Sequence, residues 1–489
     1  MPDYIDKINY ELVEKIASPL KKESLKQTLN LIDIEAKRGK ILYLYKSYQK
    51  LYGDKKLASN ILVPMVDYYF SKKQDKKSVV SLVVVNDPED AERLAFNHVK
   101  KVTNLKPFVL DSIISTEDVA HWNKQRREYQ PAFSMNESLK PLIPISNARA
   151  KKCVDLLFEE TNHLSKEVDI NEFLLNETHA QLQLAMFGFS NDFQETHNKQ
   201  IRDTFSGTNK EYGKEIIPNL LSEINKSDGP LSTAFQNRSN EKKTKLETPG
   251  NALIFSFAGH DTTGNTLTWL IYEISKNYKI QTKLQNEVDN FWRKQGDKEI
   301  EYIDFKSLPY MTRCIMETLR LWTPLPNGTF RELVEDDEIT GLDNKRVTLP
   351  KGTFIQIPNF SRHLNPELWG DDVLEFNPDR KFRDEELWEN TVINSYNPST
   401  KRFSPFTYGP RDCIGKNFSQ IEMRLILLHL LKRYEFSLTD KQNTRYIQED
   451  MSYNTFTSGP RNIYNELMED SRQGMYVFVH QRNAELSRL

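Results

Sequence analysis

The sequence predicts a mainly α-helical fold with a small β portion, arranged as a single large domain. Apolar residues recur three or four positions apart, which is the spacing of a buried helix face. Strand-like runs are short and fall near residues 60–100, 340–360 and 435–485. The 489 residues include 38% hydrophobic and 11% aromatic residues, so the chain can build a large core.

The composition excludes several classes of protein. Lys and Arg total 67 and Asp and Glu total 69, so the formal net charge of −2 argues against a dedicated nucleic-acid-binding protein. No apolar run approaches the roughly 18 residues of a membrane span, and the N-terminus lacks the apolar core of a signal peptide. We therefore expect a cytoplasmic or otherwise soluble intracellular protein without a transmembrane anchor. Peripheral membrane association stays open.

The N-terminal segment is a separate prediction. Residues 1–40 are expected to form an extension of two short amphipathic helices, and residues 41–489 the main domain. The first of these helices carries Ile5, Ile8, Leu12 and Ile16 on one face. The polar faces carry mixed charges, which favours packing on the body of the protein over binding to a membrane surface.

The strands of the main domain are predicted from short β-like runs bounded by turn residues. Residues 81–86 predict a buried strand, and a helix is expected to begin at Asp87-Pro88. Residues 346–349 and 353–357 predict two strands around the turn at Pro350-Lys351-Gly352. Residues 474–479 predict a strand near the end of the chain.

A long apolar helix is predicted from Asn251 to about Lys276, and the polar residues in its middle can take part in a reaction. Thr262 follows Ala258 by four positions, so its hydroxyl can bond the Ala258 carbonyl and open a groove in the helix. Asp261 can relay protons to a ligand in that groove. Taken alone, the segment also fits an ordinary core helix with a stray Asp-Thr pair.

The most specific stretch surrounds Cys413. Residues 406–415 match Phe-x-x-Gly-x-Arg-x-Cys-x-Gly, a pattern that a chain of this length would show by chance about once in ten thousand. A thiolate at Cys413 can ligate haem iron and donate electron density that favours O–O cleavage. The three cysteines are too few for a disulfide framework or a four-cysteine metal site. The alternative is a buried structural cysteine.

This stretch resembles the haem-binding motif of the cytochrome P450 family. Asp261 and Thr262 likewise resemble the acid–alcohol pair with which that family manages protons. The resemblance implies one large haem domain that holds haem b (iron protoporphyrin IX) through the Cys413 thiolate as axial ligand. It also implies that Phe406 shields the sulfur, that Arg411 pairs with a haem propionate, and that Gly415 leaves room for the haem ring.

The resemblance extends beyond the cysteine loop. Trp122 and Arg126 lie one helical turn apart and match a pair that reaches a haem propionate in the family. Arg331 is a second candidate for a propionate, and His363 matches a nearby family position less closely.

A charged network is also implied. Glu317 and Arg320 are neighbours three positions apart on a predicted helix, which alone indicates only a surface ion pair. Residues 376–380 resemble the family's Pro-Glu-Arg segment with Asp379 in place of Glu. The resemblance therefore implies that Arg380 joins Glu317 and Arg320 in a buried network that fixes the cysteine loop.

The function implied is a monooxygenase that inserts one oxygen atom from O2 into an apolar small molecule. Phe255, Phe257 and Ala258 are expected to line the pocket, but residues 135–249 contain no motif that identifies the substrate. Alternatives are a haem-thiolate isomerase, lyase or peroxygenase, and a non-catalytic haem-binding relative. The intact Asp261-Thr262 pair weighs against the first alternative, since such enzymes need no proton relay to O2.

Electrons are expected from a separate donor protein, either a flavin reductase or a ferredoxin-like protein, because the chain has no room for a fused reductase. Residues 401–433 contain seven cations and two acids, a net charge of 7 − 2 = +5. We expect this surface to steer an acidic donor toward the cysteine loop. The seven cations are Lys401, Arg402, Arg411, Lys416, Arg424, Lys432 and Arg433.

Overall fold

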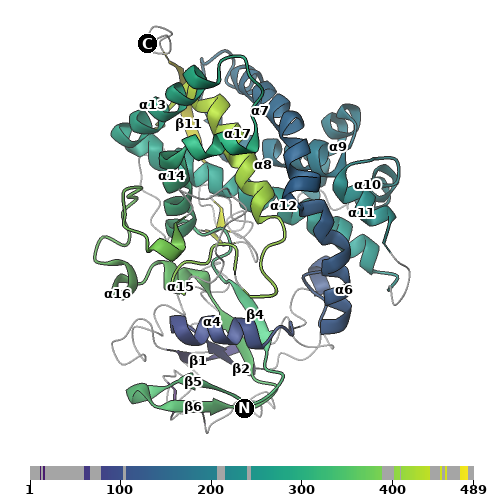
Figure 1. Ribbon diagram of the computed structural model, residues 1–489, viewed down its shortest axis with the longest axis vertical. Helices are drawn as coiled ribbons and strands as arrows, with labels where there is room; N and C mark the ends of the chain where they lie inside the picture. The colour runs from purple at the N-terminus through teal and green to yellow at the C-terminus, as the bar shows by residue number, and fades with distance from the viewer. Residues whose placement is uncertain are drawn as a thin grey trace.

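The computed structural model describes most of the chain and is mostly helical (Figure 1). The described residues are 12, 15–16, 60–66, 79–102, 106–205, 215–238, 244–387, 401–407, 409–440, 452–453, 458–459 and 474–482. The prediction of a mainly α-helical fold with a small β portion is confirmed. The predicted helices of residues 1–40 lie outside the described residues, apart from Leu12, Lys15 and Ile16.

The α-helices occupy the middle of the chain. They are α4 (Pro88–Asn97), α5 (Lys106–Val109), α6 (Val119–Tyr129), α7 (Lys140–Glu160), α8 (Ile170–Gln181), α9 (Asn191–Phe205), α10 (Ile216–Ile224), α11 (Pro230–Gln236), α12 (Glu247–Lys276), α13 (Tyr278–Gln295), α14 (Pro309–Leu321), α15 (Asn359–His363), α16 (Pro366–Trp369) and α17 (Lys416–Arg433). Shorter helical turns are η2 (Gln130–Phe133), η3 (Met135–Leu139), η4 (Leu182–Phe187), η6 (Tyr302–Ser307), η7 (Leu342–Asn344) and η8 (Asp384–Glu386).

The strands form small sheets, with β1, β2, β4, β5 and β6 in the lower part of the molecule in Figure 1 and β11 in its upper part. A four-stranded sheet has the order β1-β2-β7-β4, in which the β2–β7 pair is parallel and the other pairs are antiparallel. Its strands are β1 (Ile61–Val66), β2 (Val79–Val84), β7 (Phe354–Ile357) and β4 (Thr329–Glu332). The remaining strands are β3 (Val168–Asp169), β5 (Asp337–Thr340), β6 (Arg346–Leu349), β8 (Tyr434–Leu438), β9 (Ser452–Tyr453), β10 (Ser458–Gly459) and β11 (Tyr476–Gln481).

The predicted strand regions are present, with shifted bounds. The strand expected at residues 81–86 is β2, which runs from Val79 to Val84, and Asp87 is the N-cap of α4. The Asp87 side chain accepts from the Asp90 N–H at 2.9 Å, and Pro88 occupies the first turn. The sequence did not predict β3, a two-residue strand that pairs with β11.

Two residues of the predicted N-terminal extension pack on the body of the protein. Leu12 and Ile16 are 4% and 0% exposed and join a buried cluster with Leu62 and Val83 of the four-stranded sheet. The Leu342 N–H donates to the Lys15 carbonyl at 3.1 Å. This part of the segment therefore contributes to the core of the sheet region.

Helix α12 runs through the centre of the helical region and packs along α8 (Figure 1). It begins at Glu247, four residues before the predicted start, and ends at Lys276 as predicted. The close approach to α8 favours a small residue at Gly264, because a Cβ there would lie 3.0 Å from the Leu175 Cα. Within the described ranges, no helix combines the length and hydrophobicity that crossing a bilayer requires.

Candidate functional site

The loop that carries Cys413 is fixed by its own backbone. The Cys413 N–H donates to the Phe406 carbonyl at 3.0 Å, and the Asp412 N–H donates to the Gly409 carbonyl at 3.1 Å. Gly409 adopts a φ of 78°, and a Cβ there would lie 2.7 Å from the Ala95 carbonyl oxygen. A side chain at Gly409 would therefore be strained and would push the loop away from α4.

Cys413 differs from the other two cysteines in its surroundings. Cys153 and Cys314 are buried, whereas the Cys413 side chain is exposed. Desolvation by the surrounding protein nevertheless raises the pKa of its thiol, while the Gly415 backbone N–H acts in the opposite direction. Cys413 is therefore open to a ligand although protein atoms surround it. This geometry suits an axial ligand better than the buried structural cysteine considered above.

Among the described residues, nothing requires Gly415 to lack a side chain. Its φ is −88°, and the nearest described atom to a Cβ there would be a Phe133 ring carbon at 3.8 Å, an ordinary contact. The expected role of admitting a cofactor ring is consistent with this open space. Phe406 is half-buried and its carbonyl accepts from the Cys413 N–H, so its backbone supports the loop. Its shielding of the sulfur stays a prediction.

The middle of α12 presents the expected Ala258–Thr262 turn. The Thr262 hydroxyl donates to the Ala258 carbonyl at 3.2 Å, the bond that the spacing predicts. Ala258 is exposed although Ser256 and His260 are 1% and 3% exposed, so one face of this turn borders open space. The Asp261 carboxyl is buried at 9% exposure beside it.

The opposite face of the same turn is closed by a pair of histidines. His260 Nδ1 donates to the Ser256 carbonyl at 2.7 Å, and His179 Nε2 lies 3.0 Å from the Ser256 hydroxyl. Desolvation lowers the pKa of His260 to about 3 and that of His179 well below its usual value, so both rings are neutral. Sequence analysis gave neither histidine a role, because contacts between α8 and α12 have no local signal.

The expected pocket residues separate into two groups. Phe255 is 6% exposed and packs among the rings of Tyr129, Phe133 and Phe235. It is therefore a core residue, which corrects the expectation that it lines the pocket. Ala258 borders open space, and Phe257 is half-buried with its ring edge-on to His260 at 6.2 Å.

Three cations converge beside the cysteine loop without an acid among them. Arg331 on β4 is fully buried, and its Nε and one terminal nitrogen have no hydrogen-bond partner among the described residues. Arg411 is 8% exposed. One of its terminal nitrogens donates to the Thr116 carbonyl at 2.8 Å, and its Nε and other terminal nitrogen have no partner in the described part of the chain. Lys101 Nζ donates to the Thr329 hydroxyl at 2.8 Å. We call Lys101, Arg331 and Arg411 the cation cluster.

The electrostatics of the cation cluster indicate a missing anion. Desolvation lowers the pKa of Arg331 to about 9, and desolvation together with Arg331 lowers that of Arg411 to about 9. Desolvation, then Arg331 and Arg411, hold the pKa of Lys101 well below its usual value. Buried cations of one sign are costly unless an anion pairs with them. A group with two carboxylates, such as haem, fits this cluster.

Lys101 is the member that sequence analysis missed. It lies in a Lys100-Lys101 pair that resembles any solvated surface charge, and only the fold brings it to Arg331 and Arg411. Trp122 lies against the cation cluster, since the Arg411 guanidinium lies over its ring at 4.4 Å. Its contact with a haem propionate stays a prediction.

Arg126 makes a contact that the sequence did not predict. Its guanidinium donates to the Asp412 carboxylate at 2.7 Å and to the Asp412 carbonyl at 2.8 Å, and both residues are partly buried. These bonds use two of the five N–H groups of the guanidinium, so the pairing of Arg126 with a haem propionate stays a prediction. Arg126 also ties α6 to the residue that precedes Cys413.

His363 contacts both the cysteine loop and α14. Its Nε2 accepts from the Ser404 N–H at 3.0 Å, and its carbonyl accepts from Arg320 at 3.0 Å. Desolvation lowers the pKa of its imidazole well below the usual value, which matches a neutral ring used as an acceptor. His363 therefore links the cysteine loop to α14, and its position near a propionate stays a prediction.

Glu317, Arg320 and Arg380 form the expected network. Glu317 accepts from Arg320 at 2.7 and 2.8 Å and from Arg380 at 3.0 Å, and the three residues are 0%, 0% and 8% exposed. Arg320 also donates to the His363 and Val373 carbonyls, and Arg380 donates to Asp372. The network therefore anchors the segment after α15, against which the start of the cysteine loop packs.

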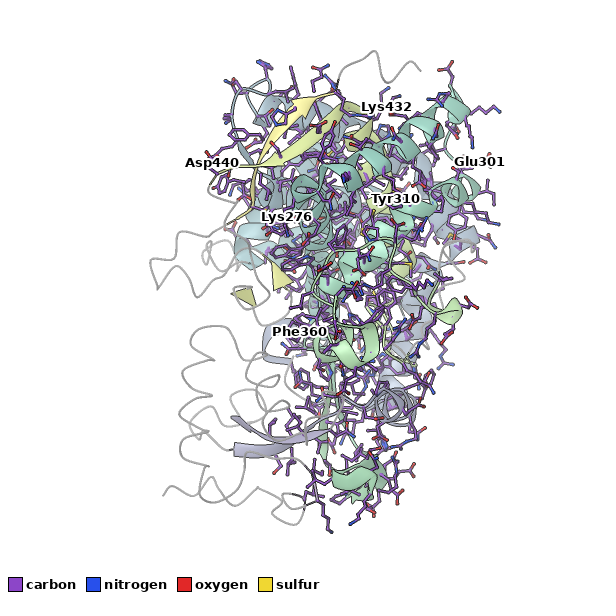
Figure 2. The ribbon with its side chains drawn as sticks, turned by 90° about the vertical axis from the view of Figure 1, so that its left-hand side faces the viewer. Lys276, Glu301, Tyr310, Phe360, Lys432 and Asp440 are labelled. Atoms are coloured by element: carbon purple, nitrogen blue, oxygen red, sulfur yellow. The ribbon has the colours of Figure 1, made fainter. Side chains whose placement is uncertain are left out.

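The expected basic surface between residues 401 and 433 is not formed. Arg402, Arg411 and Arg424 are buried, and Arg402 pairs with Glu386 at 2.7 Å. Lys401 pairs with Glu89 and Lys416 with Asp412. Lys432 and Arg433 end α17, about 25 Å along the helix from the cysteine loop, and Lys432 lies near the upper end of the molecule in Figure 2. Seven cations that are contiguous in sequence are dispersed by the fold.

Comparisons with known proteins agree with this geometry. A family model described as Cytochrome P450 matches residues 223–465. Cytochrome P450 4F5 of Rattus norvegicus is 28% identical over 397 residues, which cover 70% of this chain and 71% of the relative. Cytochrome P450 4F8 of Homo sapiens is 34% identical over 199 residues, 40% of this chain and 34% of the relative.

The comparisons differ in extent. The match to the human protein spans about a third of that relative's length, whereas the match to the rat protein spans more than two thirds. The family model covers α12, the Glu317 network and the Cys413 loop. The chain belongs to the cytochrome P450 family.

Proposed function

We propose that this protein is a haem-thiolate monooxygenase that inserts one oxygen atom from O2 into an apolar small molecule. The observation that carries the proposal is the cation cluster beside Cys413, because unpaired buried guanidinium groups beside an accessible thiol suit a group with both iron and carboxylates. When bound, haem supplies the iron at which O2 is activated.

The chain's own residues have separable tasks in holding this group. Cys413 would provide the thiolate, and the Gly415 and Phe406 backbone contacts fix its position. The cation cluster would hold the two propionates through charge-assisted hydrogen bonds. The Trp122 ring, stacked on Arg411, restricts the direction in which that guanidinium points.

Proton supply is assigned to α12. The Thr262 hydroxyl donates to the Ala258 carbonyl, so its lone pairs remain able to accept a hydrogen bond from a water in the open space beside Ala258. The Asp261 carboxyl is one residue away and can return protons to that water. The neutral histidines behind the turn hold it in place without adding charge.

The surroundings of α12 and of the cysteine loop indicate a substrate class and a docking place for the electron donor. Apolar side chains dominate the helices around α12, which favours an apolar substrate. A flavin reductase or a ferredoxin-like protein would donate the electrons, docking near the Cys413 loop, where Arg127 of α6 is exposed. We also propose that the protein is recovered without detergent, since Leu12 and Ile16 pack inward.

Turnover with a surrogate donor tests the proposal. We expect NADPH consumption that depends on a reductase and on O2, and a Thr262→Ala variant that binds ligands normally but releases more of the reducing equivalents as peroxide. Product formed without any donor would favour the isomerase, lyase or peroxygenase alternative. Haem binding without turnover across a broad set of apolar compounds would favour the non-catalytic alternative.

A further inference from the structure

Asp412, to which sequence analysis gave no role of its own, pairs with two cations. Its two carboxylate oxygens are divided between two cations: Oδ1 accepts from Arg126 at 2.7 Å and Oδ2 accepts from Lys416 Nζ at 2.6 Å. The side chains of Arg126, Asp412 and Lys416 are 18%, 13% and 20% exposed, so solvent screens the group only in part. We call these three residues the Asp412 clamp.

The clamp also holds the backbone that carries Cys413. The peptide unit between Asp412 and Cys413 has its carbonyl bonded by Arg126 at 2.8 Å and its N–H bonded to the Phe406 carbonyl at 3.0 Å. Both polar ends of this peptide are therefore satisfied, one by α6 and one by the loop itself. Rotation of the peptide would break both bonds, so the direction of the Cys413 side chain depends on the clamp.

The charges of the clamp lie next to the ligand position. Two cations and one carboxylate give a net charge of +1, and the carboxylate belongs to the residue adjacent to Cys413. An anion beside a metal centre favours its more positive oxidation state, and a cation favours the reduced state. Neutralising one member of the clamp changes this balance without touching the sulfur.

From these contacts we infer that Asp412 is a positioning residue for Cys413 whose clamp sets the reduction potential of the bound haem. This inference rests on the proposed haem-thiolate function. A residue that only held the loop in place would be needed for stability, and its charge would have no directed effect on the potential. The clamp instead predicts shifts whose direction follows the charge that is removed.

The experiment compares two variants, one that removes a negative charge from the clamp and one that removes a positive charge. Asp412→Asn removes a negative charge while keeping an oxygen that can accept from Arg126, so the potential of the ferric/ferrous couple should shift in the positive direction. Lys416→Gln removes a positive charge, so the potential should shift in the negative direction. Both shifts should shrink as ionic strength rises, because the clamp is partly exposed. The potential is measured by equilibrium titration with chemical mediators and needs no donor protein.

The chain offers a matched control. Asp379 is also a carboxylate shared by two cations, since it accepts from Lys283 at 2.8 and 2.9 Å and from Arg313 at 3.3 Å. It lies on the segment after α16, outside the cysteine loop, and its side chain is 53% exposed. Asp379→Asn should leave the potential unchanged.

The outcomes separate the inference from the function on which it rests. If the wild-type protein gives no thiolate-type spectrum, the proposed function fails first. If the wild type gives that spectrum but Asp412→Asn and Lys416→Gln leave the potential at the wild-type value, or shift it in the same direction, the inference is overturned. Should Asp412→Asn fail to hold haem, Lys416→Gln alone still decides through the sign of its shift.

Discussion

Two groups of charged residues in this protein, each built around buried arginines, differ in whether their charges are balanced. In the network of Glu317, Arg320 and Arg380, the carboxylate accepts from both guanidiniums, and backbone carbonyls take further N–H groups. In the cation cluster of Lys101, Arg331 and Arg411, the described residues supply no acid, and four guanidinium nitrogens have no hydrogen-bond partner among them. The charges of the first group are paired within the protein, and the charges of the second group are paired only when an anion binds.

This difference separates a structural role from a binding role. A balanced buried network stabilises the fold by itself, whereas an unbalanced one costs free energy until a ligand pairs with it. Both lie beside the cysteine loop, through His363 and Ser404 in one case and through Arg411 itself in the other. The substitutions below should therefore have opposite consequences for the haem-free protein.

Glu317→Ala should have the largest effect. It leaves Arg320 and Arg380 buried without their shared carboxylate, at a cost of about 3–5 kcal/mol in the free energy of unfolding. Denaturant unfolding of the haem-free protein measures this loss. The control is Asp379→Asn, which removes an exposed carboxylate nearby and should cost no more than about 1 kcal/mol. A Glu317→Ala protein as stable as the control would show that the network carries no such energy.

Arg331→Leu should separate stability from cofactor binding. The haem-free variant should be at least as stable as the wild type, because the substitution removes an unpaired buried charge. Its affinity for haem should fall roughly 10- to 100-fold, the equivalent of losing a charge-assisted hydrogen bond of about 1.5–3 kcal/mol. The rate of haem transfer to an acceptor protein measures the affinity. An unchanged transfer rate would show that Arg331 does not bind haem.

The free energy of unfolding of the haem-free protein should depend on pH through Arg331, with a smaller effect than the substitutions above. The pKa of Arg331 is about 9 in the folded protein against an ordinary value of 12.5, so above pH 9 the unfolded chain binds more protons than the folded one. Stability relative to Arg331→Leu should therefore rise with pH above 9, by up to about 1.4 kcal/mol per pH unit. Parallel stability curves for the two proteins would indicate that Arg331 has its ordinary pKa.

Sequence reasoning was most successful where the residues that act together are close in sequence. The motif at residues 406–415 and the Thr262–Ala258 hydrogen bond depend on local spacing, and the structure has both. The Glu317 network spans 63 residues and was reached only through resemblance to the family.

The misses are contacts between distant segments. Lys101 joins Arg331 across 230 positions and Arg126 joins Asp412 across 286, and neither pair has a local pattern to announce it. The expected basic surface was wrong for the related reason that residues contiguous in sequence are separated by the length of α17. Charge counted along the chain does not locate charge on the surface of a helix that is buried along most of its length.

The absorption spectrum of the reduced carbon monoxide complex tests most directly whether Cys413 is the haem ligand. The account predicts the red-shifted band of a thiolate ligand in the wild type and in Cys314→Ser, whose sulfur is buried elsewhere. Cys413→Ser should lose that band while its far-ultraviolet circular dichroism still shows the helical fold. A thiolate-type band that persists in Cys413→Ser would contradict the account.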